Sequence, residues 1–164
     1  MSHAPSVREH TPVSNLLRLS EPVSLALHAA ALLARQPDQR IANARLAATL
    51  QVSEHHLAKV MQRLARAGLV SSTRGPQGGF QLERAADRVA LIELFEAVDG
   101  PVGEAKCLLS HQICDGRDCL VGELVHDVHE HVRRYLAETT LARLAEGFTF
   151  VELDSEGGAG STGP

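Results

Sequence analysis

Apolar residues recur every three or four positions through the first half of the chain, and this spacing predicts three helices. The first begins with Ser20 as its N-cap, runs through SLALHAAALLAR and ends near Pro37. Asn43 is the candidate N-cap of a short helix, ARLAATL, and Ser53 caps a third, EHHLAKVMQRLARAG, which Gly68 ends. A short helix, a tight turn and a longer helix form the pattern of a helix-turn-helix. The apolar side chains expected to face inward in this stretch are Leu46, Leu50, Val52, Leu57, Val60 and Leu64.

The residues after the third helix predict a β-hairpin. A β-prone run at 69–73 is followed by a turn dense in Gly and Pro and by a returning run at 80–82. The turn, RGPQGG, carries one cation, Arg74, on a backbone with almost no side-chain bulk. Directly after a helix-turn-helix, such a hairpin is expected to be a wing whose Arg enters a narrow minor groove while backbone amides approach phosphates. An ordinary Gly-rich turn is the alternative.

Two further helices are predicted beyond the hairpin. Residues 89–98 are amphipathic and end at Asp99-Gly100-Pro101, and a long helix is expected from 120 to 144. Apolar side chains along the long helix alternate at spacings of four and three, as in a coiled-coil seam. We expect this seam to join two copies of the chain, while packing on the chain's own core is the alternative. The seam consists of Val121, Val125, Val128, Val132 and Tyr135.

These elements predict a mainly helical fold class, a winged helix-turn-helix DNA-binding domain with a small β-hairpin wing and a long C-terminal dimerisation helix. We expect a mobile N-terminal arm at 1–15 and the DNA-binding domain at 16–84. A linker helix and a cysteine loop follow at 85–119, then the dimerisation helix at 120–146. The acidic, Gly-rich segment 147–164 is expected to be disordered. Aromatic residues make up only 3% of the chain and Trp is absent, so the core must consist of Leu, Ala and Val, which favours packed helices.

Charge is divided unevenly along the chain. The formal net charge is −4, but residues 1–84 carry 10 Lys/Arg and 5 Asp/Glu, a net of +5. Residues 85–164 carry 6 Lys/Arg and 15 Asp/Glu, a net of −9. The basic half contains the helix-turn-helix, so we expect it to bind double-stranded DNA.

Other classes of protein find little support in the sequence. No apolar run approaches the ~18 residues needed to span a bilayer and no secretory signal is visible, so we expect a cytoplasmic protein without a membrane partner. No nucleophile elbow, phosphate-binding GxxxxGK[ST] motif or recognisable carboxylate pair is present, so we expect no enzymatic activity.

The run VSEHHLAKVMQRLARAGLVSSTRGPQGGFQL is followed by LIELFEAVDGP, three cysteines and a long helix ending YLAETTLARL. This arrangement resembles the Rrf-two (Rrf2) family, the IscR/NsrR-type winged-helix transcription regulators. The likeness covers about residues 16–146, and its most specific elements are RGPQGGF and the cysteine loop between two helices. The resemblance implies a homodimer that binds DNA through the third helix and the wing. In many members three cysteines also hold an iron–sulfur cluster.

Every cysteine of the chain, Cys107, Cys114 and Cys119, lies within 13 residues. An odd number of thiols in a cytosolic protein disfavours structural disulfides, and three thiolates on one loop can converge on one metal centre. With the resemblance, these thiolates favour an iron–sulfur cluster, 2Fe-2S rather than 4Fe-4S. Zinc, with His111 completing a Cys3His site, is an alternative. A Cys114–Cys119 disulfide switch and three unliganded thiols are the others.

Three cysteines leave the fourth position of a cluster to another group. The candidates are His28, on an apolar face of the first helix, and His111 in the loop, with Glu104 behind them. By itself, His28 is typical of a satisfied core or interface histidine. The resemblance favours a ligand, because family members take one from the first helix of the partner subunit. One turn earlier this chain has Ser24, a poor iron ligand, where some relatives carry a carboxylate.

The candidate DNA contacts lie on the third helix and on the hairpin turn. Ser53 as N-cap directs free backbone amides toward a phosphate, and His55 and His56 lie early on the helix, where base edges are reached. Lys59 and Arg63, one turn apart, are expected to meet phosphates, although such charges often form only a solvated face. The candidates in the turn are Arg74, Gly75, Gln77 and Gly78.

Together these features predict a homodimeric regulator whose binding to a palindromic operator is controlled by the cluster, through its redox state, nitric oxide or cluster loss. Assembly of the cluster would fix the loop and bias the separation or tilt of the two DNA-binding heads. The alternatives are a zinc- or thiol-disulfide-based regulator of the same fold and a non-regulatory iron–sulfur or zinc protein.

Overall fold

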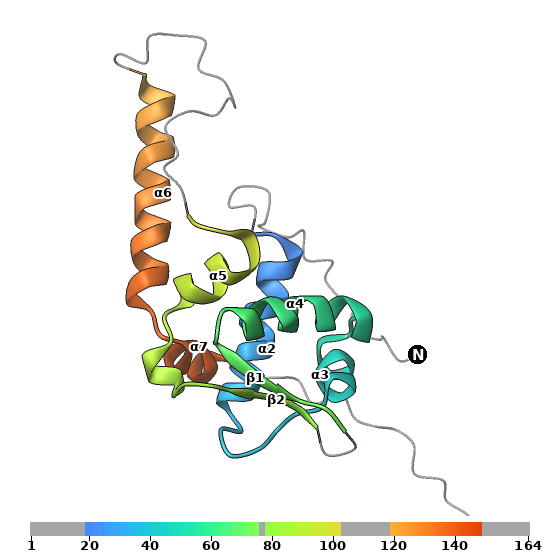
Figure 1. Cartoon of the computed structure of the whole chain (residues 1–164). Helices are drawn as coiled ribbons and strands as arrows, with labels where there is room; N and C mark the ends of the chain where they lie inside the picture. Colours follow the sequence, from blue (N-terminus) through green and yellow to red (C-terminus); the bar gives the residue numbers. More distant parts are fainter. Residues whose placement is uncertain (1–18, 76–77, 103–118, 149–164) are drawn as a thin grey trace, which may run out of the picture.

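The computed structural model describes residues 19–75, 78–102 and 119–148, which form a helical body with one hairpin and one projecting helix (Figure 1). A short 3-10 helix, η1, precedes α5. In chain order the elements are α2 (Glu21–Ala34), α3 (Asn43–Leu50), α4 (Glu54–Arg66), β1 (Val70–Thr73), β2 (Gly79–Leu82), η1 (Ala86–Arg88), α5 (Leu91–Asp99), α6 (Leu120–Glu138) and α7 (Leu141–Gly147). The predicted mainly helical fold class with a two-stranded wing is confirmed.

Helix α2 lies at the centre of the body and packs against α3, α4, α5, α7 and β2. Half of its residues are buried, and most of these are alanines, whose small side chains let neighbouring helices approach closely. The large buried side chains around it are almost all Leu and Val, as the composition predicts. Of the predicted inward positions, Leu46, Leu57, Val60 and Leu64 are buried, and Leu50 and Val52 are half-buried.

Two of the three predicted helix caps are confirmed. The Ser20 hydroxyl accepts a hydrogen bond from the Val23 amide and the Ser53 hydroxyl accepts one from the His56 amide, each at 3.2 Å. The prediction for Asn43 is wrong, because Ala42 is the N-cap and Asn43 is the first helical residue. Its side-chain amide instead donates to the Glu54 carbonyl oxygen at 2.9 Å, which ties the start of α3 to the start of α4.

The hairpin is anchored to the body through its second strand. Strands β1 and β2 are antiparallel, with Val70 opposite Leu82 and Thr73 opposite Gly79. On the other side of β2, Ile41 and Phe80 exchange two backbone hydrogen bonds of 2.9 Å. Gly79 has φ +151°, and a Cβ atom there would lie 2.5 Å from the Ile41 carbonyl oxygen. Only glycine therefore permits this close pairing, which fixes the direction of the wing.

The predicted single helix from 120 to 144 is wrong, because Thr139 and Thr140 interrupt it. Thr140 forms an isolated β-bridge with Ala90, and its hydroxyl caps α7. The Leu91 amide donates to the Thr139 carbonyl oxygen at 2.9 Å, and the amide that follows Thr140 donates to the carbonyl of Val89. Two successive β-branched residues favour this extended pairing over a helix, and they join the end of α6 to the start of α5.

A charged cap holds the start of α5 and gives a stability prediction. One Glu93 carboxylate oxygen accepts from the Ala90 amide at 2.9 Å and the other pairs with Arg84 at 2.5 Å. Burial raises the pKa of Glu93, but the hydrogen bonds from Arg84 and Ala90 and the charge of Arg84 outweigh it, so the pKa is lowered. The stabilisation is therefore complete above the unfolded-state pKa and is lost as pH falls through the folded-state pKa.

Glu93→Ala is expected to lower the free energy of unfolding by about 1 kcal/mol at pH 7, because it removes the cap and the ion pair. The difference from the wild type should be smaller at about pH 3, because the charge-dependent stabilisation is lost progressively once pH falls below the unfolded-state carboxyl pKa of about 4.3. Urea denaturation at both pH values, at one protein concentration, measures this. The exposed Glu83→Ala is the control, and a gap for Glu93→Ala that is equal at both pH values would contradict the prediction.

Candidate nucleic-acid interface and metal centre

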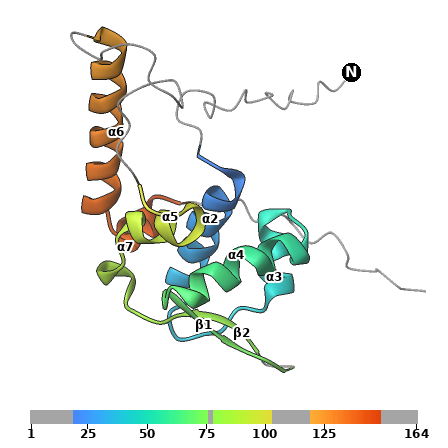
Figure 2. The ribbon, with the colours of Figure 1, turned by 45° about the horizontal axis from the view of Figure 1, so that its top comes forward.

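Helix α4 packs on α2, α3 and α5 and leaves one face open to solvent. Both views place α3, α4 and the hairpin in one part of the molecule and the start of α6 at the opposite side (Figures 1 and 2). The buried side of α4 carries Leu57, Val60, Met61 and Leu64. Its exposed face follows helical spacing through His55, Lys59, Gln62 and Arg66. Gln62 and Arg66 were not among the predicted contacts, although extending the spacing from His55 and Lys59 identifies both.

Two predicted DNA contacts on α4 are turned toward other helices. His56 is half-buried, and its Nδ1 lies 3.9 Å from a carboxylate oxygen of Glu21 on α2. The Arg63 guanidinium donates to the Val98 carbonyl oxygen of α5 at 2.9 Å. His55 and Lys59, by contrast, make no side-chain hydrogen bond or ion pair within the described part of the chain and lie open to solvent. The DNA contacts themselves stay predictions.

The hairpin presents Arg74 just after β1. Its side chain is exposed and has no hydrogen-bond or ion-pair partner in residues 19–75, 78–102 and 119–148. Gly75 has φ +113°, and the Gly78 amide donates to the Gly75 carbonyl oxygen at 2.9 Å, which closes the turn. A Cβ atom at Gly78 would collide with the Thr73 carbonyl oxygen, so this turn requires glycine. The predicted contact Gln77 lies outside the described residues.

Of the predicted metal ligands in the cysteine loop, the structure describes Cys119. It is the N-cap of α6, is half-buried, and its Sγ accepts a hydrogen bond from the Gly122 amide at 3.3 Å. This amide hydrogen bond fixes the sulfur at the start of α6, next to the cysteine segment. This environment fits a cluster ligand. The other candidates of the loop lie outside the described residues: Cys107, Cys114, His111 and Glu104.

His28 has the hydrogen bonding expected of a metal ligand. Its Nδ1 donates to the Ser24 carbonyl oxygen at 2.7 Å, which leaves Nε2 as the nitrogen for a metal. A backbone carbonyl that fixes one ring nitrogen in this way is the usual arrangement behind a ligating histidine. Phe148 packs on the ring, with centroids 4.7 Å apart. In both views the start of α6 is well separated from α2, so one chain does not bring Cys119 and His28 together (Figures 1 and 2).

Helix α6 carries an exposed apolar stripe, which we call the α6 stripe, consisting of Leu120, Val121, Leu124, Val128 and Tyr135. From Val121 onward its members follow spacings of three and four, with exposed His131 filling the one gap. Of the predicted seam, Val121, Val128 and Tyr135 belong to the stripe, whereas Val132 packs against the chain's own core and Val125 is half-buried on the same side. The dimer contact itself stays a prediction. Leu124, 62% exposed, was missed in the prediction. A stripe of this kind is typical of a protein interface.

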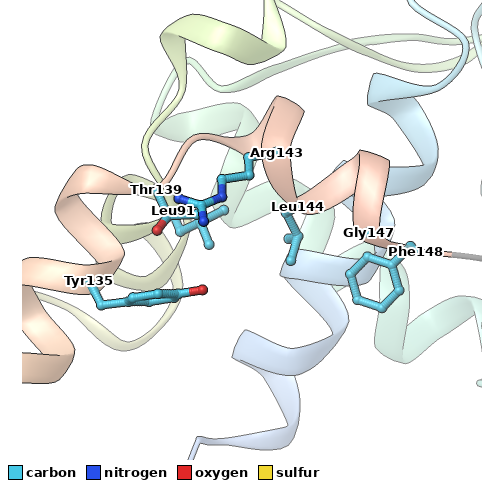
Figure 3. A pocket seen from close by; sticks show the side chains of 7 residues that line it. All are labelled: Leu91, Tyr135, Thr139, Arg143, Leu144, Gly147 and Phe148. Atoms are coloured by element: carbon cyan, nitrogen blue, oxygen red, sulfur yellow. The ribbon is translucent and has the colours of Figure 1, made fainter.

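A hollow of about 290 Å³ lies where α6 and α7 meet, next to the end of the α6 stripe (Figure 3). Tyr135 belongs to both the stripe and the hollow. Phe148, which packs on His28, lines its other side, and Leu144 lies between them (Figure 3). The remaining lining residues are Leu91, Thr139, Arg143 and Gly147. The end of the stripe, the hollow and His28 are thus neighbours in the structure.

Of the helices that the structure describes, none combines the length and the apolar character that a membrane span requires.

Comparison with known proteins identifies one family. The Rrf2 family model, described as an iron-dependent transcriptional regulator, matches residues 19–147. The chain is 38% identical over 93 residues to the HTH-type transcriptional regulator IscR of Erwinia tasmaniensis, covering 57% of this chain and 56% of that protein. It is 36% identical over 96 residues to IscR of Xenorhabdus nematophila, covering 58% of each chain. These matches span somewhat more than half the length of the curated relatives.

Solved structures agree with the sequence comparison. CymR of B. subtilis, described as the global cysteine regulator, superposes with a TM-score of 0.68 at 26% identity, over 80% of this chain and 98% of that one. IscR of T. potens superposes with a TM-score of 0.61 at 21% identity, over 78% of this chain and 85% of that one, which bears on the fold alone. The relatives named here are regulators of transcription and none is named as an enzyme.

Proposed function

Because this chain belongs to the Rrf2 family of transcriptional regulators, we propose that it is a homodimer that binds a palindromic DNA operator under the control of an iron–sulfur cluster. The observation that carries the DNA-binding part is the exposed face of α4 together with the exposed Arg74 of the hairpin, which has no partner within residues 19–75, 78–102 and 119–148. A helix of this kind enters the major groove while the wing contacts the adjacent backbone or minor groove. Gln62 and Lys59, half-way along the face, are suited to a base edge and a phosphate.

The α6 stripe supports the homodimer. Five large apolar side chains exposed along one helix are costly in water, and a second copy of the same stripe covers them symmetrically. Antiparallel pairing of two α6 helices would place the start of one beside the end of the other. The end of α6 is where Tyr135, the hollow and His28 lie. In this arrangement Cys119 of one protomer approaches His28 of the partner subunit.

Cys107, Cys114 and Cys119, with His28 of the partner subunit, are the residues that would hold the cluster. The hydrogen bonds at Cys119 and His28 suit a thiolate and an imidazole nitrogen ligand, respectively. When bound, a cluster supplies a redox couple and a centre that reacts with oxidants or nitric oxide. The chain's contribution is to link that centre across the dimer, so that the relative position of the two DNA-binding heads depends on it.

The first experiment is an ultraviolet–visible spectrum with iron, sulfide and zinc analysis on protein purified without oxygen. The proposal predicts broad absorbance at about 300–500 nm with bound iron and sulfide, lost on exposure to oxidants. A colourless protein with stoichiometric zinc, unchanged after reconstitution with iron and sulfide, would contradict it and favour a zinc regulator. A metal-free protein whose DNA binding follows thiol oxidation would favour a disulfide switch.

Arg74→Ala is expected to weaken operator binding by about 10-fold or more, with the largest loss on A·T-rich flanks, because a narrow minor groove attracts arginine. Fluorescence anisotropy at fixed salt, on two duplexes that differ only in their flanks, measures this. Arg74→Lys is the matched control, since it keeps the charge. Should Arg74→Ala lose equal affinity on both duplexes, and Arg74→Lys lose none, Arg74 is a phosphate contact only.

A further inference from the structure

We propose that Arg63 is a positioning residue that couples the DNA-binding helix to the cysteine segment, through its hydrogen bond to the end of α5. This inference rests on the proposed function, and it assigns to Arg63 a role other than the phosphate contact that the sequence predicts. The coupling is carried by a contact within one chain, between α4 and the residues that lead into the segment with Cys107 and Cys114.

The contact joins two helix surfaces at a point where a partner is needed. The Arg63 guanidinium lies 2.9 Å from the Val98 carbonyl oxygen. Val98 is only 7% exposed and lies in the last turn of α5, whose final carbonyls have no partner within the helix. A guanidinium there satisfies a carbonyl and also matches the negative end of the helix dipole. Breaking the contact would leave the Val98 carbonyl poorly solvated and without a hydrogen bond. The contact therefore fixes the position of α4 relative to the end of α5.

The chain leaves α5 along a fixed path immediately after this contact. Gly100 has φ +88°, and its amide donates to the Glu96 carbonyl oxygen at 3.0 Å. The Val102 amide donates to the Glu96 carboxylate at 3.3 Å. Pro101 between them restricts the backbone further. A displacement of Val102 would therefore also move the last turn of α5, because Gly100 and Val102 are both hydrogen-bonded to Glu96.

The other end of the cysteine segment is connected to α5 through the length of α6. Cys119 opens α6, and α6 packs against α5. At the C-terminal end of α6 the Thr139 carbonyl oxygen accepts a hydrogen bond of 2.9 Å from the amide of Leu91, the first residue of α5. The Val102 flank of the cysteine segment is thus bonded directly to α5, the Cys119 flank is connected to it through α6, and α5 packs against α4. Arg63 is the side chain of α4 that is hydrogen-bonded to α5 among the described residues.

The position of Arg63 on α4 separates this role from DNA binding. It lies at the edge of the exposed face, toward α5, whereas Lys59 and Arg66 lie on the face itself and make no hydrogen bond or ion pair with any described residue. Removing Arg63 therefore leaves the main cations of the face in place. Arg66→Ala is the matched control, since it removes an arginine from the same helix, one turn away, without touching α5.

The test is the ratio of operator affinities between cluster-loaded and cluster-free full-length protein, measured at fixed salt for the wild type, Arg63→Ala and Arg66→Ala. We expect a wild-type ratio of about 10-fold or more, of either sign, to fall to within about 3-fold of unity in Arg63→Ala. Arg66→Ala should weaken both forms equally and keep the ratio. Arg63→Met, which keeps the aliphatic stem and lacks the donor, replaces Arg63→Ala if the latter fails to fold.

A second readout needs no cluster. Amide hydrogen exchange of Gly100 and Val102 in cluster-free protein should accelerate in Arg63→Ala and stay unchanged in Arg66→Ala. The inference is overturned if Arg63→Ala lowers both affinities by one factor, keeps the wild-type ratio and leaves these amides unchanged. If cluster-loaded and cluster-free wild-type protein bind the operator equally, the proposed cluster control is overturned, and the coupling through Arg63 with it. The wild-type measurement alone distinguishes this outcome from failure of the inference about Arg63.

Discussion

Leu124→Glu is expected to convert the dimer into monomers and to lower operator affinity by about 100-fold or more. Leu124 is 62% exposed in the middle of the α6 stripe, and a charge there would be buried against the partner without a counter-charge. In a dimer, binding of the first half-site makes binding of the second intramolecular. A monomer binds only one half-site and lacks this gain in affinity, which accounts for the size of the effect. Sedimentation velocity gives the oligomeric state, and anisotropy on a palindromic duplex gives the affinity.

Ala137→Glu is the matched control, because Ala137 is exposed on the polar side of the same helix. It introduces the same charge away from the stripe and should leave both the dimer and DNA binding intact. If Leu124→Glu remains dimeric with wild-type affinity while Ala137→Glu dissociates, the interface lies on the other side of α6. The α6 stripe would then have another partner.

Cys107→Ala is expected to abolish the absorbance at about 300–500 nm and to reduce bound iron and sulfide to background, because two remaining thiolates do not hold a cluster stably. Operator affinity of this variant should equal that of the cluster-free wild type, whichever form binds more tightly. The measurement is a spectrum with metal and sulfide analysis, followed by titration of the operator without oxygen.

Ser110→Ala, in the same segment, is the control for Cys107→Ala and should keep the full spectrum. A Cys107→Ala protein that retained iron and sulfide at the wild-type level would contradict the ligand assignment. Retention of zinc by the wild type, with loss in Cys107→Ala, would identify the same thiols as a zinc site instead.

Local signals in the sequence predicted much of the fold. The caps at Ser20 and Ser53 depend only on a hydroxyl three or four residues before an apolar repeat, and both are present. The Gly-rich hairpin was predicted from its turn residues. The structure adds a second reason for glycine at position 79, which is its close approach to the Ile41 backbone. Asn43 carries the same cap signal, but its side chain bonds to Glu54 across the turn, a tertiary contact that a local pattern does not encode.

The features that the sequence did not predict share one physical cause, which is contact between segments distant in sequence. The break at Thr139 depends on backbone hydrogen bonds to Val89 and Leu91, at the start of α5. The apolar residues of α6 form two adjacent stripes, and the pattern alone does not show that Val132 faces the chain's own core while Leu124 faces solvent. Similarly, the reach of Arg63 to Val98 requires α4 and α5 to be packed together. Residue type and spacing identified the candidate interface and DNA-binding residues. The packing of the helices determines which of them face solvent and which contact another helix.

One titration tests most directly whether the cluster controls DNA binding. An operator selected from a random pool of duplexes by the full-length protein is titrated, without oxygen and at fixed salt, with cluster-loaded and with cluster-free wild-type protein. We expect a palindromic site and affinities that differ by about 10-fold or more between the two forms. Equal affinities of the two forms for that site would contradict it.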